Sequence, residues 1–238
     1  MAVTHFSGPL QYSGKGTVTG AWGTDLTISA NPAVVSYLDD FLGVALDSTN
    51  DWTVVKDTGA SAAIVADTVN GLLGLNSAAT TDDDGASIQG NEVYKAAADK
   101  VVWFETRLQC NDADQTDICV GLTVNFATNP EAMLTAADRI VFQVDDGGSS
   151  ILCKTEKNGT ETSTDSGVDI VSGTAVTLGF HVVSTGKVEF FVNRNLVATH
   201  TTNIPDDENL AIGLMQLSGS ATGTKSISVD YVFAAQSR

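Results

Sequence analysis

The stretch TAVTLGFHVV-STGK-VEFFVNRNLVATH, residues 174–200, decides the fold class of this chain. Over residues 174–183, Val176, Leu178, Phe180 and Val182 fall on one face, and the residues between them fall on the other. This period of two is typical of a β-strand and not of a helix. The segment STGK separates two such runs, so the stretch predicts two antiparallel strands joined by a tight turn.

The same alternation recurs through the rest of the chain. The pair Asn158-Gly159 lies between two alternating runs and favours a hairpin, because both central positions of such a turn require positive φ. The other expected strands cover residues 63–67, 72–76, 86–89, 100–110, 118–126, 139–145, 150–156, 161–163, 210–217 and 226–235. Short strands at a spacing of about 8–12 residues, without an internal repeat or βαβ alternation, predict one antiparallel β-sandwich or jelly roll.

The chain divides into three regions. Residues 1–30 are expected to form an extended arm rich in glycine, residues 31–50 a short helix and linker, and residues 51–238 the β-sandwich. The helix is expected to run from Asn31-Pro32 to about Phe41, because Asn is a good N-cap and Pro fits the first helical position. The same signal at Asn129-Pro130 predicts one or two further helical turns.

The order of the last strands resembles the C-terminal half of concanavalin-A-like jelly rolls. It consists of two strands, an Asn-containing corner, a third strand and a final strand that contains Asp230-Tyr231. This superfamily includes legume lectins, laminin-G-like modules and family-16 glucanases. The segment 191–194 is similar to the laminin-G pattern aromatic-Val-Asn-Gly, with Arg194 in place of Gly as a candidate contact residue. The resemblance implies the fold, which by itself does not fix an activity.

Charge excludes two classes of partner. The formal net charge is −17, and residues 1–38 contribute only one Lys and one Asp. An acidic body repels the phosphates of nucleic acids and the surface of anionic membranes, so neither is an expected partner. The chain opens without a basic, apolar leader and has no window of about 20 apolar residues, so synthesis in a cytoplasm without export is expected.

No arrangement of residues in the sequence predicts catalysis. Family-16 glucanases place three carboxylates on one strand as Glu-x-Asp-x-x-Glu, and this chain has no such triplet. It also lacks Gly-x-Ser-x-Gly and His-Glu-x-x-His. His181 is expected on a sheet surface. The protein is therefore expected not to be an enzyme.

The sequence offers weak candidates for metal binding and for a disulfide. Asp112, Asp114 and Asp117 have the best spacing for calcium among several acidic loops, and no other cofactor is expected. The three cysteines show no metal-binding pattern. Buried free thiols are the favoured interpretation, and a bond between Cys110 and Cys119 is the alternative.

The arm and the absence of catalytic motifs suggest a structural role. We expect Phe6, Leu10, Val18, Trp22 and Leu26 to bind a partner, since large apolar side chains anchor extended segments. The chain looks like a virion structural protein of a tailed bacteriophage, made in the host cytoplasm. It would decorate the capsid surface as a cement protein, forming a homotrimer at a threefold axis, with its arm added to major capsid subunits by β-augmentation.

The alternative role is recognition of carbohydrate. In this interpretation the chain is an adhesin or a receptor-binding module of a tail or fibre, with the same fold. Such a protein needs exposed aromatic side chains on which a sugar can stack. Trp52, Tyr94 and Trp103 are the candidates for this platform.

Overall fold

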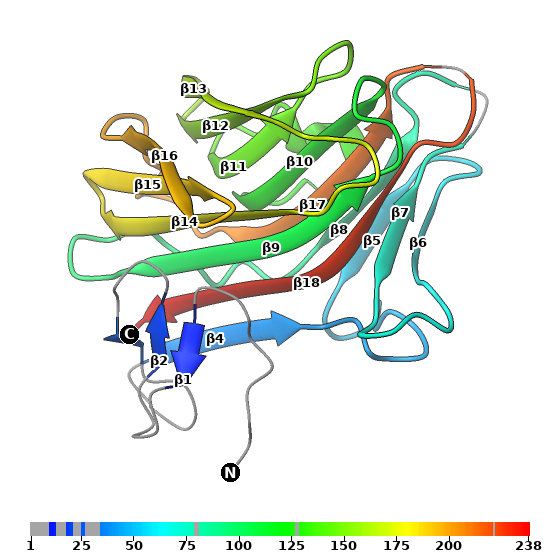
Figure 1. Ribbon diagram of the computed structural model, residues 1–238. Helices are drawn as coiled ribbons and strands as arrows, with labels where there is room; N and C mark the ends of the chain where they lie inside the picture. The colour runs from blue at the N-terminus through cyan, green and yellow to red at the C-terminus, as the bar shows by residue number, and fades with distance from the viewer. Residues whose placement is uncertain are drawn as a thin grey trace.

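In a computed structural model the protein is a sandwich of two antiparallel sheets (Figure 1). The structure describes residues 34–78, 81–126, 129–220 and 222–238. Before them it describes only the backbone of three short strands that pair with one another, β1 (Leu10–Tyr12), β2 (Val18–Gly20) and β3 (Asp25–Leu26). The predicted all-β antiparallel sandwich is confirmed.

Each sheet of the sandwich combines runs of consecutive strands with strands that are distant in sequence. The seven-stranded sheet has the order β13 (Thr160–Asp169), β12 (Ser150–Lys157), β11 (Arg139–Val144), β10 (Thr116–Thr123), β17 (Ala211–Ser218), β8 (Gly85–Gln89) and β5 (Thr53–Lys56). The eight-stranded sheet has the order β16 (Asn195–His200), β15 (Lys187–Val192), β14 (Val176–Ser184), β9 (Val102–Cys110), β18 (Ser226–Ser237), β7 (Leu73–Asn76) and β6 (Ser61–Ile64), and β4 (Val34–Asp39) also pairs with β18.

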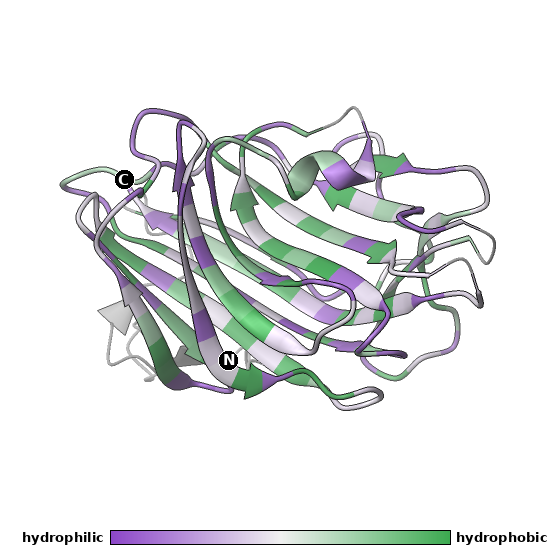
Figure 2. Cartoon of the chain, turned by 90° about the horizontal axis from the view of Figure 1, so that it is seen from above, coloured by the Kyte–Doolittle hydropathy of each residue, from purple (hydrophilic) through white to green (hydrophobic). Residues whose placement is uncertain are grey.

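Alternation along the strands produces the core between the sheets. In the view from above, hydrophobic and hydrophilic residues follow one another along the strands (Figure 2). Phe104 and Phe180 stack with ring centroids 5.0 Å apart, and Phe142 meets Phe190 edge-on at 5.3 Å. These four rings come from β9, β14, β11 and β15, so the aromatic core joins the two sheets directly.

The hairpin predictions agree with the structure. β14 and β15 pair antiparallel around the turn at residues 185–186, as the alternation predicts. Asn158 and Gly159 form the turn between β12 and β13 with φ of 51° and 75°. Asn129 caps the short helix η1 (Pro130–Met133) by accepting a hydrogen bond from the backbone N–H of Ala132. Among the described residues no helix is long and apolar enough to cross a membrane.

The predicted helix from Asn31 to Phe41 is wrong. Residues 34–39 form the strand β4, which pairs with the second half of β18 in the register Tyr37↔Ala234. Its sequence alternates, with Tyr37 packed against the core and Ser36 exposed, and this pattern outweighs the Asn-Pro signal. The strand therefore extends the sandwich into the region that the sequence predicts as helix and linker.

A short strap, residues 129–138, lies over the outer face of the seven-stranded sheet. Met133 of η1 packs with Cys119, Val141 and Met215 in a second apolar cluster. The strap can approach the sheet closely because Gly213 has no side chain, and a Cβ there would lie 2.9 Å from the Met133 methyl group. This face is therefore covered.

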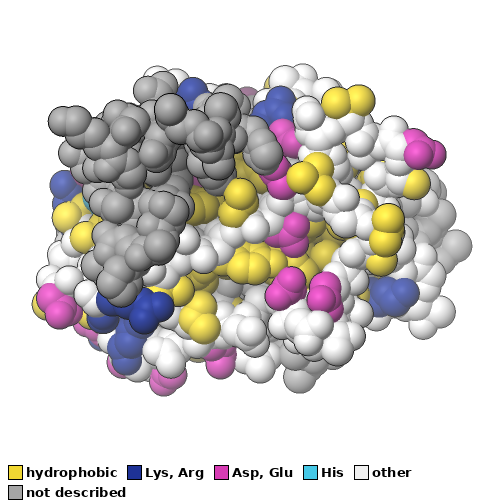
Figure 3. Space-filling model, turned by 90° about the horizontal axis from the view of Figure 1, so that it is seen from below, with side chains coloured by type: hydrophobic (Ala, Val, Ile, Leu, Met, Phe, Trp, Pro, Cys, Tyr) yellow, Lys and Arg dark blue, Asp and Glu magenta, His cyan; other side chains and the backbone are white. Residues whose placement is uncertain are grey.

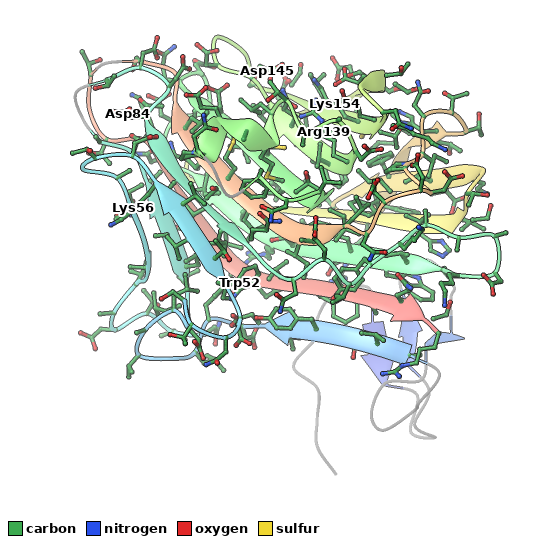
Figure 4. The ribbon with its side chains drawn as sticks, turned by 180° about the vertical axis from the view of Figure 1, so that it is seen from behind. Trp52, Lys56, Asp84, Arg139, Asp145 and Lys154 are labelled. Atoms are coloured by element: carbon green, nitrogen blue, oxygen red, sulfur yellow. The ribbon has the colours of Figure 1, made fainter. Side chains whose placement is uncertain are left out.

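A buried ion cluster holds the end of the strap. Arg139 donates to Glu156 at 2.8 Å, to Glu161 at 3.0 Å and to the carbonyl of Met133 at 3.0 Å. Lys154 pairs with Glu161 at 3.3 Å. Arg139 and Lys154 lie side by side on the seven-stranded sheet, away from Trp52 (Figure 4). Each charge in this cluster has a protein partner, so we interpret it as structural.

Candidate functional site

A small cleft lies between β4 and the loop that follows β8. Its volume is about 200 Å³. Two tyrosines and several polar side chains face it. The residues that define this tyrosine cleft are Val35, Tyr37, Asp51, Asn91, Tyr94 and Ile212. Ligand sites in proteins are typically concave and apolar with a few placed polar groups, and the cleft has this composition.

Three separate elements position the two tyrosines. Tyr37 projects from β4, which is anchored along β18. Tyr94 is fixed by two backbone hydrogen bonds with Leu210, one donated in each direction, of 3.0 and 2.6 Å. The loop that carries Tyr94 starts at Gly90, whose backbone N–H donates to the carbonyl of Ile212 at 2.9 Å. The cleft is therefore built on paired backbone.

The half-buried carboxylate of Asp39 supports the aromatic wall of the tyrosine cleft. Asp39 accepts from the indole N–H of Trp52 at 2.9 Å, from the backbone N–H of Phe41 at 2.8 Å and from the Tyr37 hydroxyl at 3.4 Å. The rings of Tyr37 and Trp52 meet edge-on with centroids 5.6 Å apart. Trp52 also lies under Gly90, where a Cβ would be 3.8 Å from the indole. These contacts hold the aromatic wall rigid.

Both tyrosines keep their hydroxyl protons at physiological pH. Burial raises the pKa of Tyr37, and the neighbouring carboxylates of Asp39 and Asp51 raise it further. Burial alone raises the pKa of Tyr94. The cleft therefore offers neutral hydroxyl groups, while the exposed Asp51 at its rim offers an acceptor.

The predicted glycan platform is only partly assembled. Tyr94 lines the tyrosine cleft and Trp52 packs against its Tyr37, whereas Trp103 lies on the outer face of the eight-stranded sheet, stacked on His181 at 5.4 Å. The exposed fractions of Trp52, Tyr94 and Trp103 are 3%, 2% and 5%, so the expectation of three exposed rings is not met. The sequence prediction misses Tyr37 because it assigns a helix to this segment, although the alternation of Tyr37 with Val35 is a usable signal.

The calcium candidates do not converge. Asp112 pairs with Lys225 at 2.8 Å, Asp114 is exposed, and Asp117 is buried and accepts from the backbone N–H of Asp146 at 2.7 Å. Burial, and then the nearby carboxylates of Asp146, Asp145 and Asp83, raise the pKa of Asp117 to about 6. In the described part of the chain no three His, Cys, Asp or Glu side chains are placed to hold a metal ion.

The structure tests the prediction for the cysteines but not the prediction for the arm. Cys110, Cys119 and Cys153 are buried free thiols, so the favoured interpretation is confirmed and Cys110 does not bond to Cys119. The side chains of the arm residues Phe6, Leu10, Val18, Trp22 and Leu26 lie outside the described residues. The expected capsid partner, the homotrimer and the virion location therefore stay predictions.

Comparison with known protein families identifies the family of this chain. The family model described as "SO2946-like, C-terminal domain" matches residues 68–230, well over half of the sequence. The chain belongs to this SO2946-like family. The matched region contains the strands from β7 to the first half of β18, and also Tyr94 and Ile212 of the cleft. A search of curated protein sequences finds no match.

Solved structures with the same fold include glycoside hydrolases. The catalytic domain of an endo-1,3-β-glucanase (laminarinase) from Thermotoga petrophila has a TM-score of 0.58 at 12% identity, over 85% of this chain and 97% of that one. An endo-β-1,3-glucanase from Pyrococcus furiosus has a TM-score of 0.57 at 14% identity, over 87% and 99%. A β-glucanase from Bacillus licheniformis has a TM-score of 0.54 at 15% identity, over 84% and 97%.

These matches confirm the concanavalin-A-like jelly roll and correct one expectation. The sequence predicts that the protein is not an enzyme, because no carboxylate triplet is present. The solved structures that share its fold include glucanases and other glycosidases, which contradicts that expectation. Identity of 11–16% establishes the fold alone, so an activity has to be argued from this chain's own residues.

Proposed function

We propose that the protein binds a polysaccharide and seats one sugar ring in the tyrosine cleft. The observation that carries the proposal is the convergence of Tyr37, Tyr94, Asp51 and Asn91 on one cleft of about 200 Å³. This volume lies below the roughly 300–1,000 Å³ of sites for drug-sized ligands, which favours a single ring. The half-buried Tyr37 ring can meet the C–H groups of a sugar, while Tyr94, which is 2% exposed, forms the back of the cleft.

The polar groups of the cleft suit the hydroxyl groups of a sugar. Asp51 accepts hydrogen bonds, the Asn91 amide both donates and accepts, and the Tyr37 hydroxyl, which donates its proton to Asp39, can accept. The glucanases of the same fold support a carbohydrate ligand, although they do not identify it.

Cleavage of the bound polysaccharide is the second candidate function. Glycosidases use two carboxyl groups on either side of the scissile bond. Asp39 and Asp51 both act on the hydroxyl of Tyr37, so two carboxylates lie at the same wall of the tyrosine cleft. Asp51 is exposed to an incoming substrate, whereas Asp39 is held by Trp52 and Phe41. Asp51 is therefore the residue on which hydrolysis would depend.

Tryptophan fluorescence tests the proposal directly, because Trp52 contacts Tyr37 at the cleft wall. With Trp22 and Trp103 replaced by Phe, Trp52 is the only indole left to report. Titration with laminaritetraose and other neutral oligosaccharides should change its emission with saturation. Asp51→Asn should weaken binding about tenfold, which corresponds to about 1.4 kcal/mol.

The control is Asp114→Asn, which removes an exposed carboxylate elsewhere and should leave binding unchanged. Reducing ends are counted in the same incubations, and cleavage that is abolished by Asp51→Asn would establish the second function. Millimolar neutral oligosaccharides that leave both Trp52 emission and the amide resonances of residues 90–94 unchanged would overturn the proposal.

A further inference from the structure

A row of polar side chains crosses the outer face of the eight-stranded sheet. Tyr231 on β18 lies opposite Arg107 on β9, and Arg107 lies opposite Thr177 on β14. Thr177 in turn exchanges two hydrogen bonds with Asn193 at the end of β15, of 2.8 and 3.0 Å. Arg194 follows Asn193 in the chain. The row therefore contains two arginines.

The two arginines are close enough to serve one ligand. Arg107 and Asn193 are separated by two strand spacings, roughly 10 Å. Burial raises the pKa of both Glu105 and Tyr231, and the charge of Arg194 lowers both, so Arg194 lies near the residues beside Arg107. The Tyr231 hydroxyl donates to Glu105 at 2.5 Å. Arg107, two residues from Glu105 on β9 and paired with Tyr231, and Arg194 therefore both lie near the Glu105–Tyr231 pair.

A depression lies at the Arg107 end of the row. Its volume is about 220 Å³, and it is lined by Arg107, Gln109, Asp230, Asn70, Ser228 and Leu72. Arg107 donates to Asp230 at 2.6 Å, and its side chain is still 45% exposed. A guanidinium has five N–H groups, so donors remain for a ligand carboxylate in the paired geometry that arginine favours.

The backbone at Arg194 is strained. Asn193 and Arg194 form the turn between β15 and β16 with φ of 49° and 69°, in the left-handed region that favours glycine. An arginine at such a position costs stability that glycine would not. The side chain of Arg194 therefore offers the reason for an arginine at this turn.

Two of the four arginines of the chain lie on this face, beside the acidic residues Glu105 and Asp230. The net charge is −17 and the chain has four arginines. Arg139 is buried in the ion cluster and Arg238 is the last residue, so the other two lie in this row. Figure 3 looks at the molecule from the side of β4, where acidic and hydrophobic side chains are interspersed and basic ones gather in a few places.

We propose that this arginine row binds the carboxylate of an acidic sugar, such as a uronic acid unit of a polysaccharide. Arg107 and Arg194 hold the carboxylate, while Gln109 and Asn70 in the depression bond to ring hydroxyl groups. That the ligand is a sugar rests on the proposed function. That the ligand carries a negative charge rests on the arginine row itself. The site is separate from the tyrosine cleft.

Calorimetry with two matched probes tests this inference. At low salt, tetragalacturonate should bind to the full chain at least tenfold more tightly than laminaritetraose. Arg194→Gly should reduce the affinity for tetragalacturonate about tenfold. Glycine suits the positive φ, so this variant should fold at least as stably as the parent. Arg107→Gln should reduce the affinity similarly.

The control is Lys56→Gln, which removes one exposed positive charge from β5 of the other sheet. It should change the affinity less than twofold. Equal binding of both probes, or an equal loss in Arg194→Gly and Lys56→Gln, would overturn the arginine row. Neutral oligosaccharide binding that depends on Asp51 would survive that result. If tetragalacturonate binding depends on Arg194 but neutral oligosaccharides do not bind, only the tyrosine cleft would be overturned.

Discussion

The ion cluster around Arg139 and the tyrosine cleft use polar side chains in opposite ways. Arg139 is 3% exposed, and its bonds to two glutamates and a carbonyl are all made within the protein. In the cleft, the exposed Asp51 and Asn91 border a space of about 200 Å³. A charge that the protein satisfies internally stabilises the fold, whereas polar groups around a cavity are available to a ligand.

The largest effect is expected at the ion cluster. Arg139→Leu leaves Glu156 buried without its partner and should lower the free energy of unfolding by about 3–5 kcal/mol, the usual cost of breaking a buried ion pair. Urea denaturation measures this loss. Arg139→Leu combined with Glu156→Leu should recover some of it, because the unpaired charge is then removed. A loss below about 1 kcal/mol for the single variant would show that the cluster is not structural.

The next effect tests the strap. Met133→Ala removes a fully buried side chain from the second apolar cluster and should cost about 3 kcal/mol. Thermal and urea unfolding give the value. Glu131→Gln, an exposed change in the same helix, is the matched control and should be neutral. Unchanged unfolding of Met133→Ala would mean that the strap is loosely attached and that this face of the sheet is open.

Glu105 is intermediate between the ion cluster and the tyrosine cleft. Its carboxyl group is buried, but hydrogen bonds satisfy it only in part. Burial raises its pKa to about 7, while the hydroxyl of Tyr231 and the charge of Arg194 lower it. The folded state therefore binds this proton more tightly than the unfolded state, whose carboxyl pKa is near 4.3. Stability should fall as the pH rises from about 4 to about 7, and the loss should persist above pH 7.

Glu105→Gln should remove this pH dependence and leave the protein more stable than the parent at pH 8. The measurement is the free energy of unfolding at half-unit steps from pH 4 to pH 8. The same slope in the variant and in the parent protein would assign the pH dependence to other groups.

The smallest effect on stability is expected at the tyrosine cleft. Asp51→Asn changes an exposed residue and should alter the free energy of unfolding by less than about 0.5 kcal/mol. The same variant is expected to bind the sugar about tenfold more weakly. A stability loss as large as that of Met133→Ala would mean that Asp51 belongs to the structural class and would remove the contrast between the two regions.

The sandwich could be predicted from the sequence because alternation in segments such as 174–183 is a local property of the chain. The strand β4 could not, because its partner β18 lies almost 200 residues later and a local Asn-Pro signal suggested a helix. Asn129-Pro130 has the same signal and does begin a helix, since the strap offers no strand partner there.

The candidate site was predictable only to a limited extent. Trp52 and Tyr94 were named as candidate platform aromatics, but the burial of Trp52 depends on packing against Tyr37 and Asp39, which lie on the missed strand. The spacing of Asp112, Asp114 and Asp117 suggested a shared loop site. Instead Lys225, distant in sequence, pairs with the first of them, and the backbone of Asp146 bonds to the last.

The most direct test of the central claim is amide resonance mapping of a neutral oligosaccharide titration. With laminaritetraose as the ligand, shifts should concentrate at residues 35–37, 51 and 90–94 and should be absent from the strap at residues 129–138. Asp51→Asn should suppress these shifts. Shifts that concentrate on the strap or on the ion cluster around Arg139, with none at the tyrosine cleft, would contradict the account.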